Sequence, residues 1–327
     1  MRQRRSVGRR LVLATALALP ALQAGAAEDW PARPVRLVIP YSAGGPTDVI
    51  GRLLADRLSQ RLPQRVVVEN RTGAGGNIGA STVAHAAGDG HTLLFTNIAH
   101  AVNRALYTHL DYDPAADLTP VTIVAESPMV LLVPAARPWR TLAEFVAAVR
   151  AAPGRYSYGT SGGGGALQLV SLLLLRAAGL AMQEVPYRGS GPAALDLAAA
   201  RLDMLYDAGA TAFPLTRGGE ARALAVSTAT RSAVAPEVPS VAEAGFPEAV
   251  FSVWQAVFAP AATPAPVIAA IGAACRATLA EPLVRARLAE LGAERVVGNT
   301  PEEAARHVQA EMARWPGILR EAGVQPQ

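Results

Sequence analysis

Short apolar runs alternate with helix-patterned stretches along almost the whole sequence. Runs that predict strands occupy 35–39, 66–69, 92–96, 121–125, 156–159, 184–186, 204–206, 223–226 and 252–259. Helical periodicity occupies 48–61, 77–87, 142–151, 166–178, 192–200, 264–280, 282–291 and 301–322. This alternation predicts an α/β fold with mainly parallel sheets and helices on both faces. The length of 327 residues favours two α/β lobes over one.

The beginning of the chain has the pattern of a secretory signal peptide. Five arginines precede an apolar stretch that is too short to span a bilayer, and small residues precede Glu28. We expect residues 1–26 to be removed by cleavage after Ala26. Export follows the Sec route or, given the pair Arg9 and Arg10, the twin-arginine route. The mature protein is therefore expected in the periplasm.

Charge and cysteine content limit the partners of the mature chain. The full chain has a net charge of +4, and loss of the five signal-peptide arginines leaves −1. This balance gives no reason to expect binding to nucleic acid. The single cysteine, Cys275, lies far from the cleavage site, which predicts neither a lipid anchor nor a disulfide.

Four glycine-rich segments each follow a predicted strand and open a predicted helix. They read "YSAGGPTD", "NRTGAGGN", "YGTSGGGG" and "YRGSGPA", two before residue 127 and two after it. Any one of them could be a plain turn. A helix start, however, offers unpaired N–H groups and a positive dipole end, and ligands of open α/β sheets bind beyond the carboxyl ends of strands. Together the four segments predict an anion site between two lobes, where a side chain added at Gly45 or Gly76 would block the backbone and strain the turn.

One of these segments also matches the G-x-S-x-G pattern of serine hydrolases. In "GTSGG" the nucleophile would be Ser161. Two further glycines separate this segment from the helix, and the only histidine downstream, His307, lies within a helical pattern. A secreted serine hydrolase is therefore kept only as an alternative.

The remaining catalytic and cofactor motifs are incomplete. The segment "GAGGNIG" has glycine spacing one residue longer than the dinucleotide fingerprint, and the chain contains no lysine for a P-loop. The histidines of the chain lack the spacing of metal ligands. They are His85, His91, His100, His109 and His307. We expect no cofactor and no metal.

Long stretches of the mature sequence resemble the Bug-type solute receptors of tripartite tricarboxylate transporters. They include "WPARPVRLVIPYSAGGPTDVIGRLLADRL", "VVVENRTGAGGNIGASTVAHAAGDGHTLLF", "YDPAADLTPVTIVAESPMVLLV", "VPYRGSGPAALDLAAARLDMLYD" and "RALAVSTATRSAVAPEVPSVAEAGFP". The resemblance implies a periplasmic-binding-protein fold of type II, with two lobes joined by crossing strands near 129–133 and 252–258. Lobe 1 would comprise 27–128 and 252–327, and lobe 2 would comprise 129–251.

The resemblance also implies a function without catalysis. A monomeric receptor would bind a small carboxylate, namely a di- or tricarboxylate, an amino acid or an aromatic acid, in the cleft between the lobes. It would deliver this ligand to the large and small membrane subunits of a transporter. The alternative is a sensor, in which the same cleft serves a signalling partner.

Ligand contacts carried over from the family fall on the four glycine-rich segments and on two strand ends. For lobe 1 they are Tyr41, Ala43, Gly45, Thr47, Asp48, Gly73, Gly76, Asn77, Thr96 and Asn97. For lobe 2 they are Thr160, Ser161, Tyr187, Arg188, Gly189 and Asp207. In the family the first two loops grip one carboxylate, and lobe 2 contacts the remainder of the ligand.

Several of these residues also fit plain structural roles. Thr47, Asp48 or Asn77 could simply cap a helix, and Tyr41 could belong to the core. Arg188 could be a solvated side chain.

Asp207 would repel a carboxylate, so it is either a pocket wall or a partner for a ligand amine or hydroxyl. Its neighbour Tyr206 is expected in the core. The chain departs from its relatives at Gly165 and Gln168, where a hydroxyl residue and a histidine are usual, and at Arg188, where a lysine is usual. These changes affect the part of the site that contacts the far end of the ligand.

Overall fold

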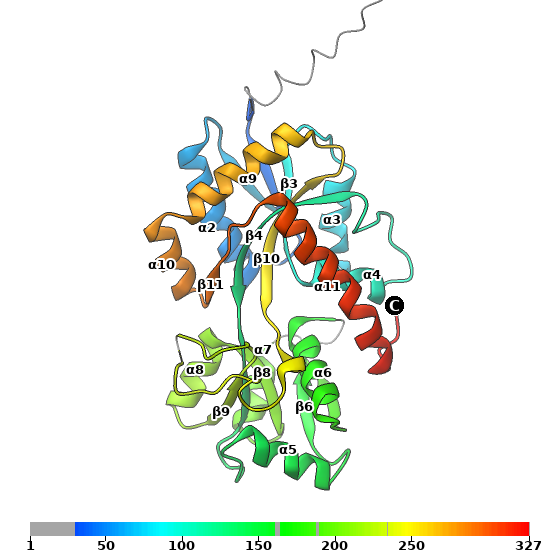
Figure 1. Ribbon diagram of the computed structural model, residues 1–327, viewed down its shortest axis with the longest axis vertical. Coiled ribbons are helices and arrows are strands. Elements are labelled where there is room, and N and C mark those ends of the chain that lie inside the picture. The colour runs from blue at the N-terminus through cyan, green and yellow to red at the C-terminus, as the bar shows by residue number, and fades with distance from the viewer. Residues whose placement is uncertain (1–29, 161–163, 188–189, 234, 327) are drawn as a thin grey trace, which may run out of the picture.

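The structure is a computed structural model that describes residues 30–160, 164–187, 190–233 and 235–326. Two β-sheets organise the chain, one above the other in Figure 1. The upper sheet contains β1 (Val35–Ile39), β2 (Val66–Asn70), β3 (Thr92–Asn97), β4 (Leu118–Ser127), β10 (Val253–Pro260) and β11 (Arg295–Val296). The lower sheet contains β5 (Met129–Pro134), β6 (Ser157–Thr160), β7 (Gln183–Pro186), β8 (Met204–Ala208) and β9 (Ala221–Val226). We call the upper sheet with its helices lobe 1 and the lower sheet with its helices lobe 2.

Both sheets repeat one strand order. Lobe 1 has the order β11-β4-β10-β3-β1-β2 and lobe 2 the order β7-β6-β8-β5-β9. In lobe 1, β1 lies between β2 and β3, and in lobe 2, β6 lies between β7 and β8. The strand that arrives from the other lobe comes next in the order. Strand β10 separates β3 from β4, and β5 separates β8 from β9. Apart from β11, which has no counterpart in lobe 2, the two lobes therefore share one topology.

The prediction of mainly parallel sheets is wrong. Strand β1 pairs in parallel with β2 and β3, and β6 pairs in parallel with β7 and β8. Strands β10 and β5, however, run antiparallel to both of their neighbours. Each of these strands enters its sheet directly from the other lobe, so no crossover helix turns it parallel.

The helices agree with the predicted ranges to within three residues wherever one was predicted. Lobe 1 carries α2 (Pro46–Arg61), α3 (Asn77–Ala84), α4 (Ala99–Leu106), α9 (Ala265–Leu279), α10 (Pro282–Glu290) and α11 (Pro301–Glu321). Lobe 2 carries α5 (Leu142–Ala151), α6 (Ala166–Ala178), α7 (Ser190–Ala198) and α8 (Gly209–Arg217). Two 3-10 turns, η1 (Ala74–Gly76) and η2 (Pro247–Ala249), complete the described elements. Among the described residues, no single helix is long and apolar enough to cross a membrane.

Two of the best-matched helices begin at a capping box. Thr141 accepts a hydrogen bond from the backbone of Glu144, whose side chain accepts one from the backbone of Thr141, and Thr300 and Glu303 repeat this pattern. Reciprocal capping satisfies two otherwise unpaired N–H groups. Helices α4 and α8 were missed in the sequence, because α4 is short and α8 contains Pro214.

The chain passes between the lobes twice. Pro128 separates β4 from β5, and the return passage runs through Phe251 into β10. The buried hydroxyl of Ser227 accepts a hydrogen bond of 2.9 Å from the Met129 N–H and donates one of 2.7 Å to the Phe251 carbonyl. One side chain thus ties both crossing segments together.

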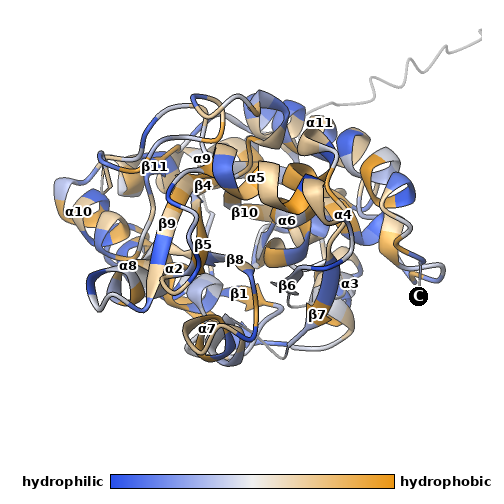
Figure 2. Ribbon diagram, turned by 90° about the horizontal axis from the view of Figure 1, so that it is seen from below, coloured by the Kyte–Doolittle hydropathy of each residue, from blue (hydrophilic) through white to orange (hydrophobic). Residues whose placement is uncertain are grey.

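Buried apolar side chains form three clusters. One cluster lies within lobe 1 and one within lobe 2, whereas the third joins both lobes and includes Leu106, Phe251, Trp254 and Trp315. Helices α4, α6 and α11 contribute to the joint cluster, and Figure 2 shows that α6 is mostly hydrophobic. The lobes therefore share a core on the side of these three helices (Figure 1).

Candidate ligand-binding site

The first glycine-rich loop is held by the carboxylate of Asp48. Its Oδ2 accepts hydrogen bonds of 2.8 Å from the Gly44 N–H and from Arg52 Nε, and its Oδ1 accepts one of 2.7 Å from Asn70 Nδ2. Burial alone would raise the pKa of this carboxyl, but the hydrogen bonds from Arg52, Asn70 and Gly44 outweigh it and hold the pKa below its ordinary value. The ionised carboxylate of Asp48 therefore holds the loop in place. The N-cap residue of α2 is Gly45 and not Asp48.

Tyr41, which follows β1, connects this loop to the end of β3. Its hydroxyl lies 3.1 Å from Thr96 Oγ1 and donates a hydrogen bond of 2.9 Å to Asn97 Oδ1. The amide nitrogen of Asn97 in turn donates a bond of 3.0 Å to Thr47 Oγ1. Burial raises the pKa of Tyr41 to about 12, so the phenol keeps its proton. Four of the expected lobe 1 residues, Tyr41, Thr47, Thr96 and Asn97, thus form one hydrogen-bonded group.

The second glycine-rich loop needs glycine at the start of α3. Gly73, Gly75 and Gly76 have φ values of 126°, 63° and 97°, which side chains rarely adopt. A Cβ on Gly76 would lie 3.4 Å from the hydroxyl of Tyr41 and 3.4 Å from Cβ of Pro40. The residue before α3 therefore lies beside the Tyr41 hydroxyl, which is linked to Thr47 of α2 through Asn97.

Gly45 differs from Gly76 in its backbone conformation. Its φ is −72°, an ordinary value, and an added Cβ would lie 3.3 Å from the carbonyl oxygen of Ser42. The expectation that a side chain strains the turn is therefore wrong for Gly45 and holds for Gly76. Ala43 in the same loop is exposed.

Asn77 is the first residue of α3 and makes no side-chain cap, so the capping alternative is wrong for it. Its Oδ1 accepts hydrogen bonds of 2.8 Å from Asn103 Nδ2 and 2.9 Å from the Tyr112 hydroxyl. These two donors fix the orientation of the amide, and its buried Nδ2 has no hydrogen-bond partner among the described residues. A buried N–H donor of this kind is available to a ligand oxygen.

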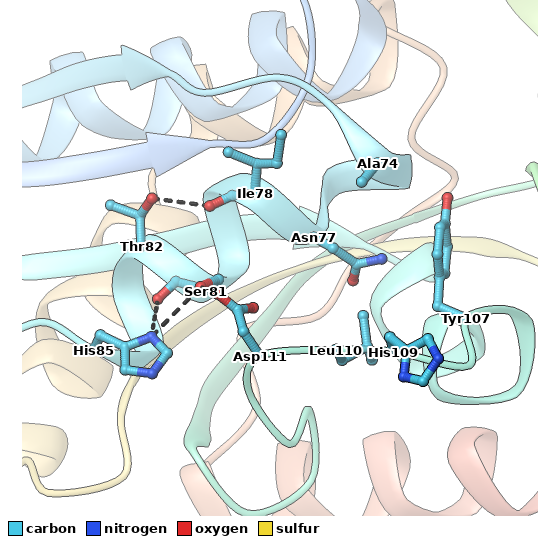
Figure 3. A pocket seen from close by; sticks show the side chains of 10 residues that line it. All are labelled: Ala74, Asn77, Ile78, Ser81, Thr82, His85, Tyr107, His109, Leu110 and Asp111. Atoms are coloured by element: carbon cyan, nitrogen blue, oxygen red, sulfur yellow. Dashed lines mark hydrogen bonds between the residues drawn. The ribbon is translucent and has the colours of Figure 1, made fainter. Parts of the chain in front are cut away.

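A pocket of about 720 Å³ adjoins Asn77 along α3 (Figure 3). Figure 3 shows the Asn77 nitrogen on the side of Tyr107, while the other end of the pocket holds Ser81, His85 and Asp111. The Ser81 hydroxyl donates a hydrogen bond of 2.7 Å to Asp111 Oδ2, and His85 Nδ1 lies 3.0 Å from the Ser81 carbonyl oxygen. At that end the polar groups bond to one another.

In lobe 2 the end of β6 is bonded to β7 and α6. The Thr160 hydroxyl donates a hydrogen bond of 2.6 Å to Glu184 Oε1, and Gln168 Nε2 donates one of 2.8 Å to the same oxygen. Gln168, one of the departures from the family pattern, thus joins the buried Thr160 in bonding to the exposed Glu184. Three expected contacts, Ser161, Arg188 and Gly189, lie outside the described residues.

Asp207 is the penultimate residue of β8 and is 2% exposed. Its Oδ1 accepts a hydrogen bond of 2.8 Å from the Ala208 N–H. Burial raises the pKa of this carboxyl above its ordinary value, although the hydroxyls of Thr211 and Ser190 oppose the shift. The neighbouring Tyr206 is fully buried in the joint core, as expected.

The remaining predicted lobe 2 contact, Tyr187, follows β7 and is partly buried. Its hydroxyl donates a hydrogen bond of 2.8 Å to Asp196 of α7. Three supporting residues of lobe 1 were missed. Asn70 could have been found as a polar residue at a strand end, whereas Asn103 and Tyr112 reach Asn77 from distant segments without a local signal.

The sequence and the fold match known proteins over nearly their whole length. A family model described as tripartite tricarboxylate transporter family receptor matches residues 50–324. Protein BugT of Bordetella pertussis is 36% identical over 299 residues, which are 91% of each chain. The solved structure of R. palustris Rpa4515 with adipate is 37% identical with a TM-score of 0.79, covering 91% of this chain and 100% of that one. MatC (Rpa3494) from Rhodopseudomonas palustris with bound malate is 36% identical with a TM-score of 0.75, covering 89% and 100%.

Proposed function

Because the chain belongs to the tripartite tricarboxylate transporter receptor family, we propose that it captures a small carboxylate between its two lobes and delivers it to a membrane transporter. The predicted periplasmic-binding-protein fold is confirmed, since solved periplasmic receptors match it and the chain forms two α/β lobes. The identity of the transporter partner, with one large and one small membrane subunit, is part of the proposal.

The two helix starts of lobe 1 carry the proposal. A Cβ on Gly76, which precedes α3, would lie 3.4 Å from the Tyr41 hydroxyl, and Thr47 of α2 is linked to that hydroxyl through Asn97. The first N–H groups of each helix lack partners within the helix, and the buried Nδ2 of Asn77, the first residue of α3, has no hydrogen-bond partner among the described residues. Such an arrangement stabilises a carboxylate through N–H groups and helix dipoles without a nearby cation.

The position of the ligand follows from this assignment. We place the ligand carboxylate on lobe 1, between Tyr41, Gly76 and Asn77, and its remaining atoms against lobe 2. Asp207 then faces a ligand amine or hydroxyl or forms part of the pocket wall. The lobes divide at 128/129 and 251/252, and residues 1–26 are a signal peptide that directs the mature receptor to the periplasm.

We further propose that the protein is a receptor without enzymatic activity. The hydrolase alternative would need His307 beside Ser161, but His307 lies in α11 with its ring 5.5 Å from that of Trp254, edge to face. The test is ester hydrolysis by the parent protein and by Ser161→Ala. We expect none in either, and a hydrolysis that is lost in the variant would overturn the receptor assignment.

A ligand screen by thermal unfolding tests the main proposal. Mono-, di- and tricarboxylates, amino acids and aromatic acids are compared at matched ionic strength. A ligand present at about 100 times its Kd should add about 2.7 kcal/mol to the free energy of unfolding. A lack of stabilisation by every carboxylate, with the protein folded, would contradict a carboxylate receptor.

Transport is separated from sensing by a cellular experiment. Deletion of the gene should abolish uptake of the stabilising ligand and leave transcription that responds to the same ligand intact. The opposite result, normal uptake with a lost response, would favour the sensor.

A further inference from the structure

Gly164, at the start of the segment that leads into α6, lies directly against Leu106, the last residue of α4. A Cβ on Gly164 would lie 1.9 Å from Cδ1 of Leu106 and 3.2 Å from its Cγ. Gly164 also has a φ of +76°, and both residues are buried. Helix α4 belongs to lobe 1 and α6 to lobe 2, and Figure 1 shows them on the same side of the molecule. The two lobes therefore touch here, away from the two crossing segments, at a point where no side chain other than hydrogen fits.

The side chain of Gln168 holds Gly164 in this place. Its Oε1 accepts a hydrogen bond of 2.8 Å from the Gly164 N–H, while its Nε2 donates to Glu184 Oε1. Glu184 Oε1 also accepts a hydrogen bond from the Thr160 hydroxyl. Gln168 is only 6% exposed, so its amide has both a donor and an acceptor partner within the protein. Buried amides satisfied on both sides fix the groups that they bond.

Leu106 is likewise fixed to the lobe 1 residues that we assign to the ligand. Helix α4 follows β3 closely, and Asn97 Oδ1 accepts hydrogen bonds from the Ala99 N–H and from the Tyr41 hydroxyl. Asn103, one turn before Leu106, bonds to Asn77. A continuous chain of contacts thus runs from the lobe 1 ligand residues through α4 to Leu106, and from Gly164 through Gln168 to Thr160 of lobe 2.

We propose that Gln168 is a positioning residue of the binding site, which seats Gly164 on Leu106 and thereby sets the separation of the two lobes. The inference rests on the proposed function only in that the two lobes hold the two halves of the site. It explains why Gly164 and Gln168 occur together at the start of α6. The glycine gives the close approach, and the glutamine supplies the acceptor for its N–H.

The first test measures the separation of the lobes in the ligand-free protein by electron spin resonance between two labels. Labels at Asp56→Cys in α2 and Arg217→Cys in α8 report one distance between the lobes, since both sites are exposed. The natural Cys275 is fully buried, and burial raises the pKa of its thiol to about 12, so it stays unlabelled.

Gln168→Leu keeps much of the volume but removes the acceptor for the Gly164 N–H. We expect it to shift or broaden the distance distribution by more than about 2 Å, the scale of a domain rearrangement. Ser171→Ala is the matched control, because Ser171 is buried in the same helix and its hydroxyl bonds only within it, to the Leu167 carbonyl. This control should leave the distance unchanged. An unchanged distance in folded Gln168→Leu would overturn the proposal.

The second test is a double-mutant cycle on the contact itself, read as urea midpoints. Gly164→Ala should lower the midpoint strongly in the parent protein and much less in Leu106→Ala, where the clashing Cδ1 is absent. Backbone strain at φ +76° is present in both backgrounds and cancels in the cycle. Additive losses would mean that the two residues do not interact and would overturn the proposal. Neither test uses a ligand, so their failure is distinct from failure of the receptor assignment.

Discussion

Lobe 1 and lobe 2 each bury one carboxylate at the carboxyl end of their sheets, and they treat it in opposite ways. Asp48 accepts hydrogen bonds from three donors, and its pKa lies below the ordinary value. Asp207 is buried to a similar extent, yet burial raises its pKa. Burial alone therefore does not decide ionisation. Three donors and the positive charge of Arg52 outweigh burial at Asp48, whereas at Asp207 burial outweighs the uncharged donors Thr211, Ala208 and Ser190.

This difference separates the tasks of the two lobes. In lobe 1 the negative charge of Asp48 is compensated, so the helix starts and Asn77 remain available for the carboxylate of a ligand. In lobe 2 burial raises the pKa of Asp207, so this carboxyl takes up a proton at a higher pH than an exposed aspartate does. In the proposed function, lobe 1 therefore holds the charged group of the ligand and lobe 2 lies against the remaining atoms.

Asp48→Asn should have the largest effect on stability. The amide presents N–H groups to at least one donor, so we expect the free energy of unfolding at pH 7 to fall by about 2 kcal/mol. The stabilisation exists above the unfolded pKa of about 3.9 and is lost as the pH falls through the lowered folded pKa. Urea unfolding between pH 7 and pH 2 measures this, and the parent and variant curves should converge at the acidic end.

Arg52→Ala is the control for Asp48→Asn. The Arg52 side chain is 50% exposed, so solvent screens its ion pair and we expect a loss below about 1 kcal/mol. A loss equal to that of Asp48→Asn would show that the ion pair, and not the fixed loop, stabilises lobe 1.

Gly76→Val should lower ligand affinity at least tenfold, or about 1.4 kcal/mol. The side chain must adopt a φ of 97° and approaches the Tyr41 hydroxyl. Gly45→Val is the matched comparison, because its φ of −72° suits any residue and its loss should be smaller. Calorimetry with the carboxylate found in the screen measures the Kd of each variant. Equal affinities of the parent and Gly76→Val would mean that this loop is only a turn.

Asp207→Asn should act in the opposite direction to Asp48→Asn. A raised folded pKa costs stability as the pH rises from the unfolded value of about 3.9 through the folded value. We therefore expect the variant to be more stable than the parent by about 1 kcal/mol at pH 7 and equally stable in acid. A destabilised variant at pH 7 would show that the carboxylate, and not the carboxyl group, is the form that lobe 2 needs.

The elements near the site were predicted well where local signals exist. Capping residues such as Thr141, and glycines followed by helical periodicity, mark helix starts within a few residues. The loops of lobe 1 were found for this reason. The antiparallel entry of β5 and β10 was not predicted, because it depends on the path of the chain between lobes and not on any residue within those strands.

The roles of individual polar residues were harder to predict. Asp48 was expected among ligand contacts or as a cap, but its carboxylate bonds Asn70, which is 22 residues away. The orientation of Asn77 depends on Asn103 and Tyr112, which approach only in the folded chain. Residue type and position predict where the site lies, whereas the hydrogen-bond partners that hold these residues are visible only in the tertiary structure.

Thr47→Val should have the smallest of these effects. Thr47 is 6% exposed and its hydroxyl accepts a hydrogen bond from Asn97 Nδ2, so an isosteric valine leaves that donor unpaired. We expect a loss of about 0.7 kcal/mol, which is typical of one neutral hydrogen bond. Thr228→Val provides the comparison in lobe 2, since the hydrogen bond from its hydroxyl to the Thr230 carbonyl is exposed and water can replace it. Its loss should be less than half as large in the same urea titration. Equal losses would mean that the hydrogen-bonded group around Tyr41 is no more rigid than the exposed turn after β9, and that lobe 1 is not the preformed half of the site.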